Sequence, residues 1–145
     1  MLGILTKVSL EVRPLPEATS HHLIYFGDIK NLFDFLIALV NTTPCPYAVE
    51  ILDDNYLTLL KASGAEVTDF ASGSGTLLIT YEGEEREIEA GKNVIKKLAA
   101  SYHGEEREGA DREWRHRFNM LRVRRAMPTI IPTSVRVPIA ALNQF

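Results

Sequence analysis

Cysteine is scarce in this sequence: Cys45 is the only one among 145 residues. A single thiol forms neither an internal disulfide nor a cluster of thiolate metal ligands, and such cysteine usage suits a reducing compartment. Its neighbours, Pro44 and Pro46, supply no base that would activate the thiol. The sequence therefore excludes a disulfide scaffold, and we expect no cysteine nucleophile.

Long apolar runs and strong charge are also missing. No segment approaches the roughly 18 uninterrupted apolar residues of a membrane-spanning helix. The first residues have neither the basic region nor the small-residue cleavage site of a signal peptide. A net charge of -3 gives no general attraction to nucleic acid or to an anionic membrane. We expect a cytoplasmic protein without a membrane span and without a nucleic-acid partner.

Metal-binding and phosphate-binding motifs are absent as well. His21 and His22 are neighbours in a predicted strand, so their side chains point to opposite faces and cannot bind one metal together. Gly73 and Gly75 precede a predicted strand instead of a helix, and no lysine follows them, which indicates a turn and not a phosphate loop. The sequence predicts no metal site and no catalytic residue in this chain.

The spacing of the apolar residues predicts an α+β fold. Strands are expected at 21–27, 47–54, 76–83 and 133–137, and helices at 29–41, 56–61, 84–102 and 111–127. Asp28 is the expected N-cap of the first helix, and Gly64 can end the second. This order predicts a ferredoxin-like sandwich, a mostly antiparallel sheet with helices packed on one face.

The stretch "GILTKVSLEVRPLPE", residues Gly3 to Glu17, alternates apolar and polar side chains until Pro14 and Pro16. This period of two is typical of a half-buried strand, and neither proline can donate to a strand ladder. We expect residues 1–17 to be a terminal strand and residues 18–145 to be a separate domain. Because an unpaired strand invites self-association, the pattern also favours a homo-oligomer formed through this segment.

Arginines are concentrated in "WRHRFNMLRVRRAM", residues 114–127. On a helix, Trp114, Arg117, Leu121 and Arg124 share one face. A guanidinium beside a tryptophan suits bidentate capture of a carboxylate or a phosphate. A solvent-exposed basic helix whose charge balances that of the preceding acidic residues would have the same spacing. The spacing alone therefore leaves open whether these arginines bind an anion or only balance charge.

Two further carboxylates, Asp53 and Asp54, follow a predicted strand that also contains Glu50. Paired carboxylates can act as a general acid and base. Aspartates between a strand and a helix more often accept hydrogen bonds from the first turn of that helix, so the sequence favours capping over catalysis.

Four segments in order resemble the FAD-linked oxidases of the vanillyl-alcohol oxidase type, particularly their glycolate oxidase and D-lactate dehydrogenase branch. The opening stretch is similar to the pattern G-[IV]-[IV]-T-x-[AV]-x-L-[KR]-[LV]-x-P-x-P, and "PYAVEILDD" to P-x-A-x-E-[LIM]-[LIM]-D. "EREWRHRFN" resembles a W-x-x-R segment, and "SVRVPIAAL" resembles D-x-x-[VI]-P-x-x-x-L with Ser134 in place of the aspartate.

The resemblance implies a partial cap domain that forms the roof over the flavin in an enzyme that oxidises a 2-hydroxy acid and passes a hydride to FAD. Arg117 would then pair with the substrate carboxylate, Trp114 would pack beside it, and Gly3 and Ile4 would lie where the backbone approaches FAD. The family's FAD-binding domain and its H-x-G-D-G-N-x-H segment lie outside this sequence. We therefore expect a flavin-binding domain or subunit as a partner, and expect this chain alone to be inactive and to hold no FAD tightly.

Two alternatives belong to other functional classes. A stand-alone ferredoxin-like module could bind RNA or another anion through the helix from Arg115 to Arg125. RNA-binding sheets of this kind stack bases on exposed strand aromatics, but Tyr25, Phe26 and Tyr81 form no such pattern. A small-ligand regulatory domain is the second alternative, and no ligand-binding loop supports it.

Overall fold

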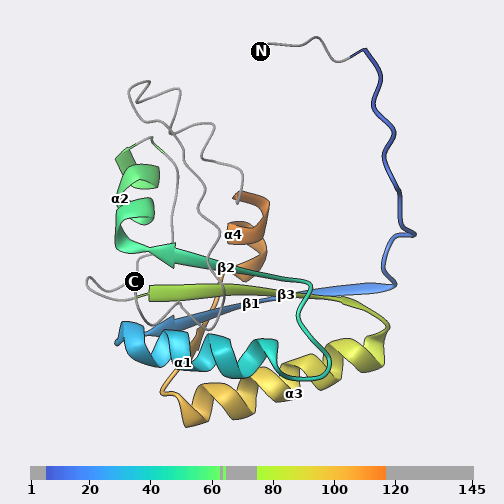
Figure 1. The fold of residues 1–145 in the computed structure, drawn as a ribbon. Coiled ribbons are helices and arrows are strands. Elements are labelled where there is room, and N and C mark those ends of the chain that lie inside the picture. Colours follow the sequence, from blue (N-terminus) through green and yellow to red (C-terminus); the bar gives the residue numbers. More distant parts are fainter. Residues whose placement is uncertain (1–5, 63, 65–74, 117–145) are drawn as a thin grey trace.

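The computed structural model describes residues 6–62, 64 and 75–116 (Figure 1). These residues form four strands and four helices. In chain order they are β1 (Ala18–Phe26), α1 (Ile29–Val40), β2 (Ala48–Asp53), α2 (Asp54–Ala62), β3 (Gly75–Gly83), α3 (Glu85–Ser101), β4 (Glu105–Arg107) and α4 (Ala110–His116).

The strands form one sheet in the order β2-β3-β1-β4, and every neighbouring pair is antiparallel. Because β3 lies between β1 and β2, those two strands run in the same direction and α1 connects them across the sheet. This split βαβ arrangement, followed by α3 and β4, is the ferredoxin-like topology. The expected α+β fold is thereby confirmed.

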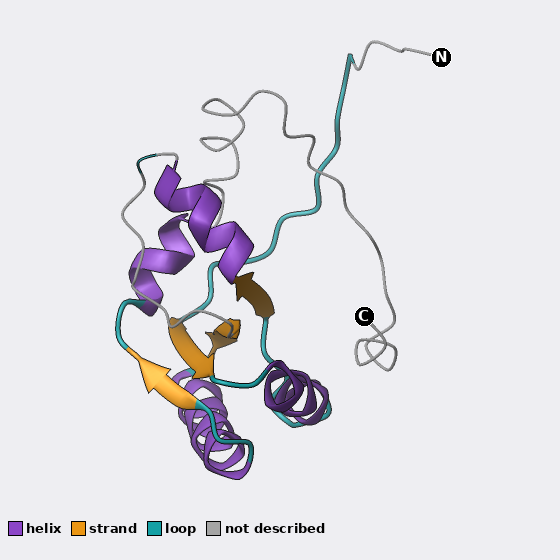
Figure 2. Ribbon diagram, turned by 90° about the vertical axis from the view of Figure 1, so that its left-hand side faces the viewer, coloured by secondary structure: helices purple, strands orange, loops and turns teal. Residues whose placement is uncertain are grey.

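The two long helices, α1 and α3, cover one face of the sheet, and the main core lies beneath them (Figures 1 and 2). The rings of Phe26 from β1 and Phe35 from α1 meet there with centroids 5.1 Å apart. The side chains that are fully shielded from solvent in this layer include Ile24, Phe26, Leu32, Phe35, Leu39, Leu77 and Ile79.

The two short helices, α2 and α4, lie over the opposite face (Figure 2). A smaller apolar cluster under them contains Leu23, Leu52, Leu57 and Leu78, with Trp114 packed against it. The sheet therefore has a helical layer on each side. The sequence predicts all four helices but places them on one face; α2 and α4 lie on the other, because the leucines of that face, Leu23, Leu52 and Leu78, also need cover.

Helix α3 approaches β3 closely at Gly91. A Cβ atom added to this buried glycine would lie 2.8 Å from two atoms of the Tyr81 ring. Tyr81 is only 2% exposed, and burial raises the pKa of its hydroxyl to about 12. The neutral tyrosine ring thus packs directly on the helix backbone, and the contact requires a residue without a side chain.

The helix ends follow the predicted capping chemistry. The Asp28 side chain accepts a hydrogen bond of 2.9 Å from the amide of Lys30 at the start of α1. The Asp53 carboxylate accepts one of 2.7 Å from the amide of Tyr56 at the start of α2, which confirms its capping role. Gly64 lies just after α2 with a φ of +76°, a conformation that favours glycine.

The last described elements differ in part from the sequence-based expectation. Strand β4 lies in a charged stretch for which the apolar pattern predicts no strand, and it forms because it pairs with Leu23, Ile24 and Tyr25 of β1. Only the beginning of the helix predicted at 111–127 is described, as α4. The strand predicted at 133–137 lies outside the described residues. In the part of the chain that the structure describes, no helix is long and apolar enough to cross a membrane.

Residues 6–17 precede the sheet as an extended, solvent-exposed segment that runs away from it (Figure 1). They pair with none of the four described strands. The apolar side chains of Val8, Leu10 and Val12 are 63%, 82% and 86% exposed. The assignment of residues 1–17 to the edge of another domain therefore stays a prediction.

Candidate functional site

Of the four residues predicted to bind substrate or cofactor, the structure describes Trp114. It lies in α4 and is half-buried over the sheet face that α2 and α4 cover. Arg117, Gly3 and Ile4 lie outside the described residues. The candidate site is therefore built outward from Trp114.

Trp114 packs on His21 of β1. The two rings are stacked, with centroids 4.9 Å apart and planes inclined by 25°. A hydrogen bond of 2.9 Å joins His21 Nδ1 to Thr80 Oγ1 on β3, where the sheet register places the two residues opposite each other. The tryptophan thus stacks on a histidine that is itself held in place by a hydrogen bond to the neighbouring strand.

Carboxylates lie on the same face, close to the tryptophan. Glu113 is only 4% exposed, and its Oε1 accepts a hydrogen bond of 3.3 Å from Arg112 Nε. Burial, and to a smaller extent the negative charges of Glu50 and Glu113, raise the pKa of the Tyr56 hydroxyl. The described charged groups of this region therefore include the carboxylates of Glu50 and Glu113 and the guanidinium of Arg112, which pairs with Glu113.

Removing the His21 side chain should loosen Trp114. We expect His21→Ala to lower the free energy of unfolding by about 1–2 kcal/mol, because a stacked pair and a hydrogen bond are lost. Trp114 is the only tryptophan, so its emission spectrum reports on this contact and should shift to longer wavelength. Thr80→Val is the matched control, since it removes the hydrogen bond but keeps the stack. An unshifted spectrum in His21→Ala would contradict this role.

The sequence indicates on which face of the sheet His21 lies, but it does not indicate that Glu113 is buried. A period of two places His21 on the opposite face from Ile24 and Phe26, with Leu23, so its side of the sheet could be predicted. Nothing in the charged run around Glu113 indicates that this carboxylate is buried, because that depends on how α4 docks. Among the described residues, no group of three or more histidine, cysteine or acidic side chains could hold a metal ion.

The strand aromatics do not offer a base-stacking surface. Phe26 is 0% exposed and Tyr81 is 2% exposed, and both lie under α1 and α3. Only Tyr25 remains accessible in part, and the Arg107 guanidinium lies 5.0 Å from the centre of its ring. The four described strands therefore lack the exposed aromatic platform that RNA-binding sheets use.

Comparison with known proteins identifies the family. A family model described as "FAD linked oxidases, C-terminal domain" matches residues 15–145. The chain belongs to this family. A search of curated proteins found no match.

A solved structure described as "alkyldihydroxyacetonephosphate synthase in P1" is similar in fold to this FAD-linked oxidase domain, with a TM-score of 0.61 and 11% sequence identity. The match covers 78% of this chain and 24% of that one. The chain thus spans about a quarter of the length of the solved protein it resembles. The family membership also means that the parent enzyme uses FAD.

The described residues do not themselves fit the diphosphate of FAD. A diphosphate binds well at a helix N-terminus, where backbone amides point at it. Here the Asp28 side chain caps α1, and α2 begins with Asp54. Glu84 is the N-cap of α3 and forms a capping box with Glu87. These carboxylates place negative charge at the starts of the three helices, so the N-termini of α1, α2 and α3 are not suited to a diphosphate.

Proposed function

We propose that this chain forms the substrate-side roof over the flavin of an FAD-linked oxidoreductase that oxidises a 2-hydroxy acid of the glycolate or D-lactate kind. The observation that supports the proposal is the His21–Trp114 stack, 4.9 Å between ring centroids, in a domain of the FAD-linked oxidase family. It fixes the first residue of the W-x-x-R segment against the sheet.

Arg117 is the proposed partner of the substrate carboxylate, with Trp114 as the packed surface beside it. The two residues are three positions apart, which is close to one helical turn. A guanidinium binds a carboxylate through two parallel hydrogen bonds. Glu50 and Glu113 add negative charge to the same face, so a carboxylate would be repelled from them and directed to the arginine.

The flavin belongs to a partner in this proposal. Residues 1–17 would be the last strand of that flavin-binding domain or subunit, with Gly3 and Ile4 next to FAD, and the chemistry would take place between the two parts. The carboxylates at the helix starts support this division, because they disfavour phosphate binding in the cap. We further propose a cytoplasmic location, which agrees with a single exposed cysteine, Cys45.

The DNA on either side of this reading frame tests the proposal directly. We expect an upstream sequence that encodes a flavin-binding domain and a downstream sequence that encodes an H-x-G-D-G-N-x-H segment, either in the same frame or in an adjacent gene. If both are absent from the neighbouring DNA, the proposed parent enzyme does not exist in this form.

The purified chain should be colourless. After the protein is mixed with excess FAD and passed through a desalting column, we expect it to show no visible absorption band of bound flavin. The reason is that the carboxylates at the helix starts repel the diphosphate. The same chain co-expressed with the flavin-binding partner should elute as a yellow complex. A yellow preparation of the chain alone would contradict the division of roles.

A further inference from the structure

Three polar side chains at the margin of the main core form a chain of hydrogen bonds. His22 of β1 is only 8% exposed, and its Nδ1 lies 2.8 Å from Glu106 Oε1 on β4. The other ring nitrogen, Nε2, lies 3.2 Å from the hydroxyl oxygen of Ser20. A serine, a histidine and a carboxylate thus follow one another in the order that serine hydrolases use for their nucleophile, their base and the group that orients the base.

The sheet itself brings these three residues together. Ser20 and His22 are two positions apart on β1, so both side chains lie on the sheet face that α1 and α3 cover. Glu106 pairs with Ile24, two positions further along β1, and is therefore the diagonal neighbour of His22 on that face. No sequence motif indicates this arrangement, because Glu106 joins it only through the pairing of β4 with β1.

The two hydrogen bonds decide which nitrogen of His22 carries the proton. An ionised carboxylate only accepts hydrogen bonds, so Nδ1–H donates to Glu106, and Nε2 of the neutral imidazole remains an acceptor. The hydroxyl of Ser20 then donates to Nε2. A general base needs this tautomer, since its unprotonated nitrogen faces the hydroxyl whose proton it takes.

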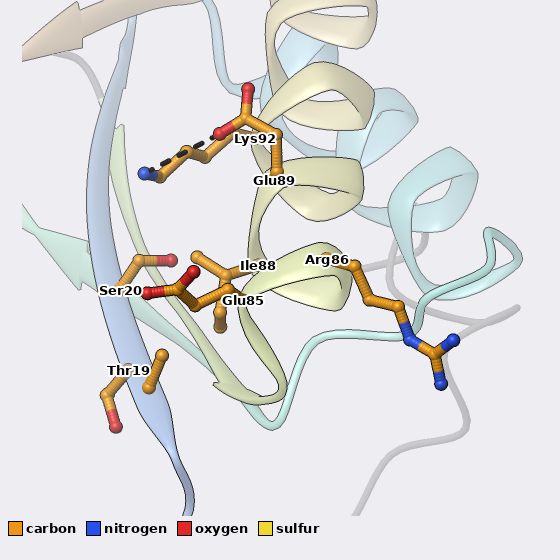
Figure 3. A pocket seen from close by; sticks show the side chains of 8 residues that line it. Thr19, Ser20, Glu85, Arg86, Ile88, Glu89 and Lys92 are labelled. Carbon is orange, nitrogen blue, oxygen red and sulfur yellow. Dashed lines mark ion pairs between the residues drawn. The ribbon is translucent and has the colours of Figure 1, made fainter.

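Ser20 also lies at a groove, which a purely structural network would not require. The groove runs between the start of β1 and the first turns of α3 and has a volume of about 540 Å³, within the roughly 300–1,000 Å³ of ligand clefts (Figure 3). Ser20 is half-buried, and its side chain points toward α3. A buried histidine finds partners for both nitrogens in many cores, but here the serine end of the network faces a space that fits a small molecule.

The other walls of the groove determine which ligand suits it. The buried side chain of Ile88 offers an apolar contact. The Lys92 side chain extends toward β1, whereas that of Arg86 points away (Figure 3). The Lys92 ammonium group lies 3.9 Å from the carboxylate of Glu89, and Glu85 adds a second carboxylate to the wall. Because the two carboxylates repel an anion, the groove suits an uncharged ester with a short acyl chain.

We propose that Ser20 is a nucleophile that His22 activates and Glu106 orients, and that this groove hydrolyses short, uncharged carboxylic esters. Ser20 Oγ attacks the ester carbonyl carbon while its proton passes to His22 Nε2, and negative charge forms on the carbonyl oxygen, toward which Lys92 supplies positive charge. The bond from the carbonyl carbon to the alcohol oxygen then breaks, and the alcohol leaves with the proton from Nε2. Water gives a proton to the same nitrogen and attacks the acyl carbon. Ser20 Oγ leaves the acid and takes this proton back.

This inference goes beyond the proposed flavin chemistry and does not depend on it. Ester hydrolysis transfers no electrons, and its three residues lie on the sheet face opposite to the one on which Trp114 packs. The experiments below use the full chain without FAD. Their failure would leave the DNA and FAD experiments unaffected, and the failure of those experiments would leave these unaffected.

Covalent labelling of the full chain tests the nucleophile. A fluorophosphonate probe should react with the chain, and tandem mass spectrometry should locate the adduct on Ser20. Ser20→Ala should abolish the labelling. The matched control is Ser101→Ala, because the Ser101 hydroxyl donates to the carbonyl of Lys97 within α3; this variant should be labelled like the unmodified chain. No adduct, or an adduct on another residue only, would overturn the proposal.

Hydrolysis of p-nitrophenyl acetate tests the base. His22→Ala should lower kcat at least about 100-fold, the lower end of what a positioned base contributes. Added imidazole should restore part of the rate beyond its own background reaction, which it would not do for a purely structural histidine. His22→Gln fills the buried space and should show the same loss if the alanine variant does not fold. Equal rates in His22→Gln and the unmodified chain would overturn the proposal.

The same assay tests Glu106 as a positioning residue. Glu106→Gln should lower kcat at least tenfold and leave KM unchanged, because the amide does not hold the imidazole in the required tautomer. The Glu106 side chain is 60% exposed, so the melting temperature should stay the same. An unchanged kcat in a folded Glu106→Gln chain would contradict the orienting role, and equal rates in Ser20→Ala and the unmodified chain would overturn the whole proposal.

Discussion

Replacing Gly91 with alanine is expected to lower the free energy of unfolding by about 2 kcal/mol, within the range for overpacked cores. In an exposed helix, replacing glycine with alanine usually has the opposite effect and raises the free energy of unfolding by about 1 kcal/mol. The sign reverses because the added methyl group would lie 2.8 Å from the buried ring of Tyr81. Neither the helix nor the ring can move away without disturbing the core between α3 and β3.

Urea denaturation followed by circular dichroism measures this effect. Ala90→Gly at the exposed neighbouring position is the control for helix propensity and should cost only about 1 kcal/mol. In a Tyr81→Leu background, which removes the ring, Gly91→Ala should become neutral or stabilising. If Gly91→Ala stabilises the otherwise unmodified chain, the close contact between α3 and β3 is wrong.

Replacing Arg117 with lysine in the full-length parent enzyme is expected to lower kcat/KM for the 2-hydroxy acid about 100-fold, which corresponds to about 2.7 kcal/mol. A planar guanidinium donates two parallel hydrogen bonds to a carboxylate, whereas an ammonium group offers a single point of charge. The positive charge is retained, so the loss measures the geometry of the contact. Steady-state kinetics with separate kcat and KM values show whether binding or the chemical step is affected.

Arg115→Lys is the matched control, because Arg115 is exposed on α4 and shares the same basic segment. It should change kcat/KM less than threefold. If Arg117→Lys has unchanged kinetics, the assignment of Arg117 to the substrate carboxylate is removed. If both variants lose activity equally, the arginines act through the overall positive potential instead of through one bidentate contact.

The main layer of the fold was predictable because its signals are local. The apolar period of α1, the capping position of Asp28 and the turn at Gly64 all depend on neighbours a few residues away. Strand β4 could not be predicted, since its three residues are charged and exposed. It exists because β1, some eighty positions earlier, has an edge available for pairing.

The candidate site, like the fold, could be predicted only in part from the sequence. Trp114 was found because its type and its spacing from Arg117 match a family pattern, and these are properties of the sequence. The stack on His21 and the burial of Glu113 arise when α4 docks on the sheet. The docking of α4 depends on side chains from β1, β3 and α2 together, so no local sequence pattern predicts it.

The insertion of β3 between β1 and β2 has a consequence for synthesis on the ribosome. Neither β1 nor β2 has a partner strand until residues Gly75–Gly83 have left the exit tunnel, because both pair with β3 and not with each other. Until then, α1 has no completed sheet on which to bury Leu32, Phe35 and Leu39. The nascent chain thus carries the apolar helix α1 exposed while residues 41–83 follow it out of the tunnel, and this is the interval in which chaperones would matter most.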